Sequence, residues 1–374
     1  MTSHPSTHRT PSLLVAALFA FAAPAYAVTV RPGHVAIVDA PRGVSPFRLP
    51  AQPWRALRRV ELPSPCAQPA VLLPDGTVAV GLDAPPGIAF ITRGGDAVTS
   101  VRLPARISQP LAVGLDGRLF VTAGRAVLTV APDGTVRAVA EFTGHAETPA
   151  YVRSDGSAVV ITTPNARSLE FVSLSAVGDV ARVSTVQTAL NAAAVFDDDR
   201  VAAVNAAQLF TVDLRGRIAT LPAPPGVRHL ASQAGTLAFA TESELLLADP
   251  QARVHTAVPL RGRAAWVAGV DGGRFAVALE VPNASAEVWI IERDGSVSSR
   301  TPTASKTRAP LVDSTGALLL AARNGDVVAI DGDGRERWRL SMHETLRPPA
   351  APLPRGGVAI ATEGNALLIV DDAP

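Results

Sequence analysis

The chain repeats itself, and this repetition constrains its fold more than any other feature. A Pro or small residue, a few apolar residues, an Asp-Gly pair or its equivalent, and then alternating apolar residues recur along the sequence, as in "QPAVLLPDGTVAVGL" from Gln68 and "QPLAVGLDGRLFVTA" from Gln109. The turn residues that mark the copies lie 36 to 43 residues apart: Gly76, Gly117, Gly156, Asp199, Gly235, Gly273, Gly316 and Gly357. Units of about 40 residues that are rich in short strands are typical of a β-propeller.

Each unit is predicted to contain four short strands. In the second unit they are residues 111–114, 119–122, 126–131 and 136–141. The Asp-Gly pair supplies the positive φ that a tight hairpin needs between such strands. The segment "GDVVAIDGDGRERWRL", residues 325–340, is then the third strand, turn and fourth strand of a blade.

The same segment does not fit a calcium-binding loop. Counting from Asp331, an EF-hand loop needs Gly at position six and Glu at position twelve. The chain has Glu336 and Met342 there. The acidic residues of this segment therefore belong to a hairpin.

The two ends of the chain are predicted to close the ring. The last unit has only three strands, at 352–354, 358–362 and 366–370, and an open sheet edge must be covered. Residues 54–62, "WRALRRVEL", have the pattern of a fourth strand without a partner. We therefore predict an all-β, eight-bladed propeller of four-stranded blades closed by this N-terminal strand, with seven blades as the alternative. A further strand, "GHVAIVD" from Gly33, has no place defined by the pattern.

The first 27 residues have the features of a secretory signal peptide. One formal charge, Arg9, precedes an apolar stretch from Leu13 to Ala23, and "PAYA" ending at Ala27 supplies small residues for cleavage. An uncleaved anchor is the alternative, but the apolar stretch is short for a membrane span. We expect cleavage near Ala27, a single propeller domain over residues 28–374 without a transmembrane segment, and a periplasmic or secreted location.

Charge and cysteine content exclude other classes. Without Arg9 the chain has 33 basic and 33 acidic residues, and this balance argues against nucleic-acid binding, which depends on phosphate neutralisation. The single cysteine, Cys66, cannot form an intrachain disulfide. We expect it to be a small, half-buried packing residue rather than a redox group.

The stretch from Gly325 to Thr362, "GDVVAID…GRERWRL…PAAPLPRGGVAIAT", resembles the repeat of the quinoprotein-like (PQQ-repeat) propeller family. That repeat runs Gly-x-apolar-x-Ala-apolar-Asp, then Gly, a Trp, and a Pro-apolar stretch before Gly and a strand. Trp338 is the clearest match to the Trp, and the resemblance weakens over residues 190–300.

The resemblance implies one of two functions. One branch of the family holds pyrroloquinoline quinone with calcium and oxidises alcohols or sugars, commonly with adjacent cysteines and a Trp against the cofactor. The other, BamB-like branch has no cofactor and serves as a scaffold in the outer-membrane β-barrel assembly machinery, normally anchored by lipid on an N-terminal Cys. This chain has one Cys, no such N-terminal Cys, Trp266 as its single candidate on an inner strand, and no evident calcium set. It is similar to the second branch, and we expect no cofactor, metal site or catalytic residue.

Cations recur on one class of loop. In propellers, the connection from an outer strand to the next inner strand opens on the face where ligands usually bind. The candidate residues on these connections are Arg106, His145, Glu147, Arg228, His229, Arg263, Lys306, Arg308 and Arg347. Convergence of their side chains would create an electropositive channel mouth for an anionic ligand or an acidic partner loop. The alternative is that they pair with acidic residues of the same face: Asp83, Glu242, Glu244, Glu280 and Glu363.

These observations predict a monomeric, exported, non-catalytic scaffold that binds another envelope protein. The alternatives are a quinone-dependent dehydrogenase and a protein that binds or senses a small anion.

Overall fold

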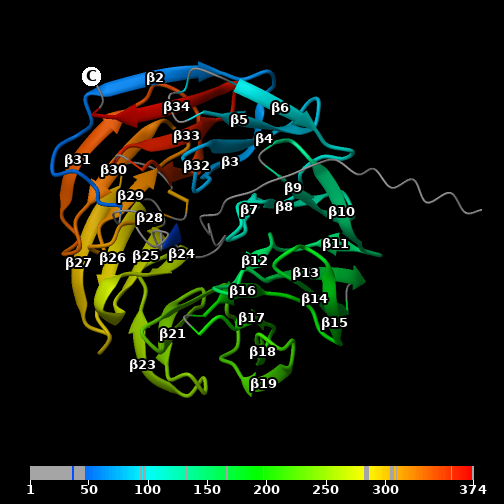
Figure 1. Cartoon of the computed structure of the whole chain (residues 1–374). Helices are drawn as coiled ribbons and strands as arrows, with labels where there is room; N and C mark the ends of the chain where they lie inside the picture. Colours follow the sequence, from blue (N-terminus) through cyan, green and yellow to red (C-terminus); the bar gives the residue numbers. More distant parts are fainter. Residues whose placement is uncertain are drawn as a thin grey trace, which may run out of the picture.

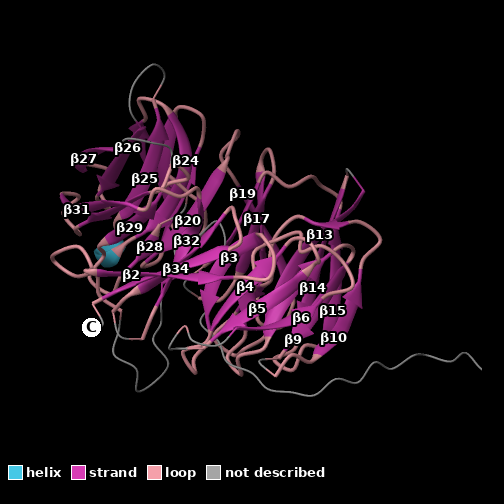
Figure 2. Cartoon of the chain, turned by 90° about the horizontal axis from the view of Figure 1, so that it is seen from above, coloured by secondary structure: helices cyan, strands magenta, loops and turns pink. Residues whose placement is uncertain are grey.

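Eight small antiparallel sheets stand around a central axis in the computed structural model of the chain (Figure 1). The structure describes residues 36–37 (backbone only), 47–92, 95, 98–131, 133–165, 167–196, 198–281, 286–303, 307–308, 310–354 and 356–372. The predicted all-β propeller with eight blades is confirmed, and the seven-bladed alternative is wrong. Figure 2 shows the ring from the side, with one helical turn among the described residues, η1 (Asp271–Gly273).

Each blade is a meander whose first strand lies nearest the axis and whose fourth lies at the rim. Blades 1 and 2 contain β3 (Cys66–Leu72), β4 (Val78–Leu82), β5 (Gly87–Ile91), β6 (Val98–Arg102), β7 (Ala112–Val113), β8 (Leu119–Ala123), β9 (Ala126–Val130) and β10 (Val136–Glu141). Blades 3 and 4 contain β11 (His145–Ala146), β12 (Tyr151–Val152), β13 (Ala158–Asn165), β14 (Ser168–Leu174), β15 (Val180–Val186), β16 (Ala192–Val195), β17 (Val201–Val204), β18 (Gln208–Val212) and β19 (Ile218–Pro222). In blade 3 the first strand is split, because both β11 and β12 pair with β13.

The remaining blades follow the same order. Blades 5 and 6 contain β20 (His229–Gln233), β21 (Thr236–Ala240), β22 (Glu244–Ala248), β23 (Val254–Pro259), β24 (Arg263–Gly269), β25 (Phe275–Glu280), β26 (Ala286–Ile291) and β27 (Val297–Thr303). Blades 7 and 8 contain β28 (Leu311–Val312), β29 (Leu318–Ala321), β30 (Asp326–Ile330), β31 (Glu336–Ser341), β32 (Leu346–Pro352), β33 (Val358–Thr362), β34 (Ala366–Asp371) and β2 (Ala56–Glu61). Trp338 lies on the outer strand β31, as predicted.

The N-terminal strand closes the ring as predicted. β2 pairs antiparallel with β34, from Ala56 opposite Asp371 to Glu61 opposite Ala366. The stretch from Gly33 also contributes a strand: β1 (Ala36–Ile37) pairs parallel with β28, the inner strand of blade 7. The rest of that stretch lies outside the described residues. The first and last parts of the chain therefore share blade 8 and, in addition, blade 7.

Residues 47–54 join these two blades. Ser314 Oγ donates to the Phe47 carbonyl (3.1 Å), and the Leu49 amide donates to Asp313 Oδ2 (2.8 Å). Farther along, the indole of Trp338 donates to the Pro50 carbonyl at 2.9 Å. We call residues 47–54 the strap, because they hold the turns and outer strand of blade 7 to blade 8.

Glycine at the turns has the predicted backbone role. Seven of the eight marker residues have positive φ, from 63° at Asp199 to 90° at Gly76. In the last unit the marker is wrong by one residue: Gly356 has φ 91°, not Gly357. The amide of Gly356 donates to the carbonyl of Leu353, so Gly356 is the fourth turn residue and needs the left-handed conformation. The inner strand before this turn is correspondingly Leu346–Pro352 rather than residues 352–354.

The core is divided among the interfaces between blades. Apolar residues of the inner three strands point to both faces of each sheet and pack against the neighbouring blades, as in the cluster of blades 6 and 7 that contains Trp266, Val288 and Leu320. Trp266 is thus used in packing, and its indole donates to Thr307 Oγ1 (3.3 Å). Among the described residues, no helix has the length and apolarity needed to cross a membrane.

Candidate functional site

The predicted site residues lie on one face of the ring. Because strands alternate in direction, the connections between blades and the turns between second and third strands of each blade all end on the same side. We call this side the connection face, and the opposite side, with the other two turns of each blade, the turn face. On the connection face, six of the eight described candidates are exposed and His229 and Arg347 are half-buried. Lys306 lies outside the described residues.

Two glycines explain how the connections reach this position. Gly144 precedes His145 and Gly262 precedes Arg263. A Cβ on Gly144 would lie 1.8 Å from the Thr163 carbonyl oxygen, and one on Gly262 would lie 2.4 Å from the Glu280 carbonyl oxygen. Only glycine lets the connection approach the end of the second strand so closely.

Two of the predicted cations pair with acidic residues of the same face. Arg106 lies 2.7 Å from Asp83, and Arg228 lies 2.7 Å from Glu242. These are the pairs that the alternative interpretation of the cations predicts. Both are exposed, so each contributes little to stability.

Around blades 7 and 8, three cations approach one carboxylate. Glu363 accepts a hydrogen bond from Arg323 at 2.8 Å. The pKa of Glu363 is lowered, chiefly by this bond and further by the charges of Arg347 and Arg308. The structure thus brings two predicted cations to one place, where positive charge exceeds negative charge. The buried Nε of Arg347 has no hydrogen-bond partner within the described part of the chain.

Arg323 is a residue that the sequence reasoning missed. It lies in the turn between β29 and β30. The predicted cations, in contrast, were all on connections between blades. Searching the second-to-third-strand turns as well would have found it, because those turns end on the same face.

Blades 5 and 6 meet at a histidine that is held neutral. His229 is half-buried, and its Nε2 donates to the Ala264 carbonyl at 3.0 Å. Burial lowers the pKa of His229, and the neighbouring Arg263 and Arg228 lower it further. His229 therefore acts as a neutral hydrogen-bond donor across the interface rather than as a third cation.

Acidification should therefore destabilise the protein through His229. The unfolded chain takes up the proton near pH 6.5, whereas the folded chain takes it up only at lower pH, so stability is lost as the pH falls below about 6.5. His229→Gln keeps a donor for Ala264 and removes the titration. Urea unfolding at pH 7.5 and 5.5 should show a larger loss of unfolding free energy in the unsubstituted protein than in His229→Gln. His255→Gln, at an exposed histidine, is the control, and equal losses in all three proteins would contradict the assignment.

His145 and Glu147 line a hollow between blades 2, 3 and 4. It has a volume of about 410 Å³, and the other lining side chains include Arg125, Thr163 and Leu190. Glu147 accepts a hydrogen bond from the hydroxyl of Thr163. The hollow combines a guanidinium, an imidazole, hydroxyl groups and the carboxylate of Glu147, which suits a small polar or anionic molecule.

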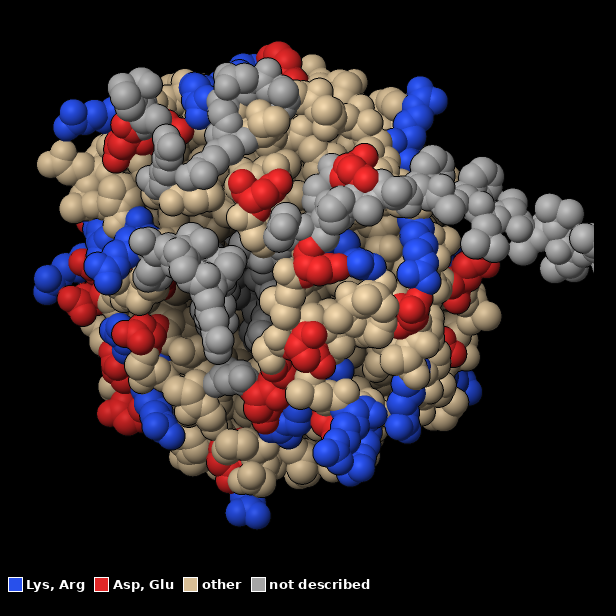
Figure 3. All heavy atoms as spheres, in the orientation of Figure 1, with Lys and Arg blue, Asp and Glu red and all other residues tan. Residues whose placement is uncertain are grey.

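The connection face as a whole does not carry one sign of charge. Its ion pairs Arg106–Asp83 and Arg228–Glu242 mix basic and acidic side chains. Basic and acidic side chains are likewise intermingled on the turn face, which Figure 3 shows. Within the described residues, no group of three or more His, Cys, Asp or Glu side chains is arranged to hold a metal ion. The positive excess is local, at Arg308, Arg323 and Arg347.

Cys66 is more deeply buried than predicted. It packs between blades 1 and 8, with its Sγ 3.5 Å from the Ala366 carbonyl oxygen. Burial raises the pKa of this thiol to about 11. The thiol therefore packs as an unreactive group, and the expectation of half-burial is wrong because the closing blade covers it.

Comparison with known proteins supports the architecture. No family model matches the sequence, and no curated protein matches it. BamB from Moraxella catarrhalis has a similar structure, with a TM-score of 0.63 and 14% identity over 85% of this chain and 98% of that chain. The Dos1 propeller has a TM-score of 0.61 and 9% identity, over 86% of this chain and 94% of that chain. A catalytically inactive virginiamycin B lyase from Staphylococcus aureus, crystallised with quinupristin, has a TM-score of 0.53 and 10% identity, over 84% of this chain and 99% of that chain. The shared feature is the fold.

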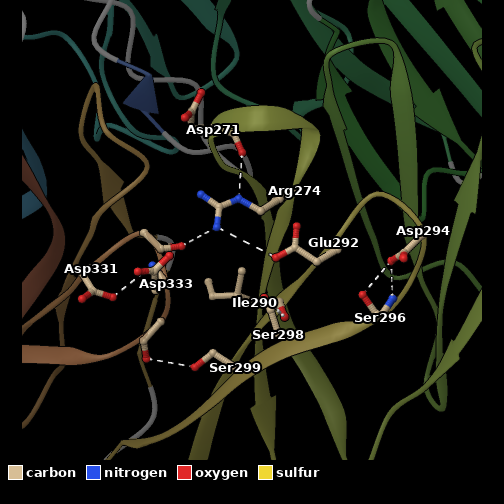
Figure 4. Close-up of polar contacts among 12 residues, drawn as sticks. Asp271, Arg274, Ile290, Glu292, Asp294, Ser296, Ser298, Ser299, Asp331 and Asp333 are labelled. Carbon is tan, nitrogen blue, oxygen red and sulfur yellow. Dashed lines mark hydrogen bonds and ion pairs between the residues drawn. The ribbon is translucent and has the colours of Figure 1, made fainter.

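Arginines on the turn face hold neighbouring blades together. Arg274 Nη1 donates to the Gly332 carbonyl of blade 7 at 2.6 Å (Figure 4). Arg153 is fully buried, and its Nη2 donates to the Val212 and Asp213 carbonyls of blade 4 at 3.0 and 2.8 Å. Arg118 of blade 2 likewise donates to the Val177 carbonyl of blade 3. These cations are occupied within the fold, which separates them from the cations of the connection face.

Proposed function

We propose that this chain is an exported, non-catalytic β-propeller that binds another protein of the bacterial envelope through its connection face. The observation that carries the proposal is the group of Arg308, Arg323 and Arg347 around the carboxylate of Glu363. This local excess of positive charge suits an acidic loop of a partner protein, because complementary charge steers association and selects the partner.

The likeness in fold to BamB supports a scaffold, and the resemblance of residues 325–362 to the PQQ repeat leads to the same branch. The signal-peptide pattern of residues 1–27 supports export. These residues lie outside the described part of the chain. Mass spectrometry of the protein secreted by a host cell would test cleavage near Ala27.

Charge reversal on the connection face should weaken partner capture. Arg263 and Arg308 are exposed, and no carboxylate of a described residue lies within ion-pair distance of either. We expect Arg263→Glu with Arg308→Glu to reduce capture from an envelope extract at low salt at least tenfold, because surface charge acts strongly there. Quantitative mass spectrometry of the captured proteins is the measurement.

The control carries the same change of charge on the other face. Arg253→Glu with Arg335→Glu places it at exposed turn-face positions and should leave capture unchanged. Unchanged capture by the connection-face variant, or an equal loss in both variants, would contradict a role for this face.

A second candidate function rests on the hollow lined by Arg125, His145 and Glu147. We propose small-anion binding there as the alternative, to be tested by thermal shift with phosphate, sulfate and small carboxylates. His145→Ala should abolish any shift that the hollow causes. Turnover of an alcohol or sugar after reconstitution with quinone and calcium would instead overturn the non-catalytic proposal.

A further inference from the structure

The outer strand of blade 3 is the least protected edge of the ring. β15 lies at the rim in Figure 1, and no described strand pairs with its outer edge. All residues from Val180 to Val183 are exposed, with Val183 at 52%. An exposed strand edge presents unpaired backbone groups to any extended chain that reaches it.

The other outer strands carry devices that block such pairing. Prolines occur in three of them, at Pro222, Pro259 and Pro302. Two or more charged residues occur in β2, β10 and β31, and β6 has only five residues. β15 has seven residues, "VARVSTV", with no proline and one charge. Proline, charge and short length are the usual means of protecting an edge, and β15 has the fewest of them.

An apolar patch continues from this edge onto the turn face. Leu115, Val177 and Leu214 are 48 to 53% exposed at the tips of turns in blades 2, 3 and 4. The turns of Leu115 and Val177 both lie against Gly156 in the β12–β13 turn: a Cβ on Gly156 would lie 3.2 Å from Ala176 Cβ and 3.5 Å from Leu115 Cδ1. Five of the eight large hydrophobic side chains that are exposed among the described residues belong to this region: Leu115, Val177, Val180, Val183 and Leu214. Clustering of this kind marks interaction surfaces.

Positive charge flanks the edge. The Arg182 side chain packs on Gly216, where a Cβ would lie 2.7 Å from its Cδ, and this places it beside Arg215 and Arg217. All three arginines are exposed, and among the described residues no carboxylate lies within ion-pair distance of their guanidinium groups. The nearby Asp213 accepts the backbone amides of Arg215 and Arg217, both at 2.8 Å, with Oδ1. The edge therefore offers a partner backbone groups for strand pairing, exposed apolar side chains, and three arginines without an ion-pair partner among the described residues.

A second copy of the chain is a poor occupant. Pairing β15 with itself would bring two clusters of three arginines together. We propose that β15 is a docking strand for an extended partner segment of alternating apolar and acidic residues, which adds a fifth strand to blade 3 and covers the apolar turn tips.

Synthetic nine-residue peptides provide the test. A fluorescent peptide of alternating Glu and Val should bind the full chain saturably in fluorescence anisotropy at 50 mM salt, and it should slow hydrogen exchange of the β15 amides. The matching Lys and Val peptide should bind at least tenfold more weakly. Arg182→Glu with Arg217→Glu should weaken binding of the acidic peptide at least tenfold, and Val183→Ser at least threefold.

Matched variants separate this surface from others. Arg253→Glu with Arg335→Glu makes the same change of charge as Arg182→Glu with Arg217→Glu. Val254→Ser removes a valine from β23 that is 45% exposed, against 52% for Val183. Neither should change peptide binding, nor should Arg263→Glu with Arg308→Glu, so the outcome is independent of the function proposed for the connection face. Equal binding of both peptides, unprotected β15 amides, or binding only to vesicles containing phosphatidylglycerol would overturn the proposal.

Discussion

Replacing Trp54 with Ala should lower the free energy of unfolding by about 3 to 5 kcal/mol, as is typical for loss of a buried Trp. Trp54 is 5% exposed and lies edge-on to Trp338, with ring centroids 5.1 Å apart. Its indole donates to the Gly356 carbonyl at 2.8 Å. This single side chain therefore joins the strap to the outer strand of blade 7 and to a turn of blade 8.

Two measurements check this effect. Urea unfolding gives the loss of free energy. Labelling of Cys66 by a thiol reagent at pH 8 reports opening of the interface between blades 8 and 1, because the native thiol is buried and its pKa is raised to about 11. We expect Trp54→Ala to speed labelling by opening the closing blade more often.

The control is a neighbour in the same closing element. Leu57 lies on β2 but is 53% exposed, so Leu57→Ala should change the unfolding free energy by less than about 0.5 kcal/mol and leave labelling slow. A Trp54→Ala variant that behaves like Leu57→Ala would mean that backbone pairing of β2 with β34 alone closes the ring.

The strap shows where prediction from sequence reaches its limit. Strands 54–62 and 366–370 could be paired in advance because the last unit lacked a fourth strand and the first stretch supplied one. The contacts of Leu49 with Asp313 and of Trp54 with Gly356 join residues far apart in the chain and follow no periodic pattern. Local chemistry predicts turns and strands, but contacts of this kind depend on the completed ring.

The candidate site illustrates the same division. Arg308 and Arg347 could be placed on one face from the repeat alone, because both lie on connections between blades and all such connections end on the same face. Their shared proximity to Glu363, and the pairing of Glu363 with Arg323, depend on how blades 7 and 8 pack. Likewise, the burial that lowers the pKa of His229 arises from the neighbouring blade. Sequence predicted the face but not the partners within it.

In six blades a glycine of the turn between the third and fourth strands packs against the preceding blade, and this contact leads to a large expected effect at Gly334. Gly334 lies between β30 and β31 with φ 83°, and its carbonyl accepts a hydrogen bond from Ser299 of blade 6 at 3.1 Å (Figure 4). A Cβ at this position would lie 2.3 Å from Ser299 Oγ and 2.4 Å from Ser299 Cβ. Gly95, Gly134, Gly178, Gly216 and Gly295 lie in the corresponding turns, each with positive φ and a side chain of the preceding blade close by.

Gly334→Ala should therefore lower the free energy of unfolding by about 3 kcal/mol, the sum of roughly 1 to 2 for the left-handed backbone and 1 to 3 for overpacking. Gly226→Ala isolates the first contribution, because Gly226 has φ 74° and nothing lies within 4 Å of its Cβ position. Combining Gly334→Ala with Ser299→Gly should recover part of the loss, since the opposing Cβ and Oγ are then absent. Urea unfolding of the four proteins measures both contributions. Equal losses for Gly334→Ala and Gly226→Ala would show that backbone conformation alone requires glycine, and that the contact between blades adjusts at little cost.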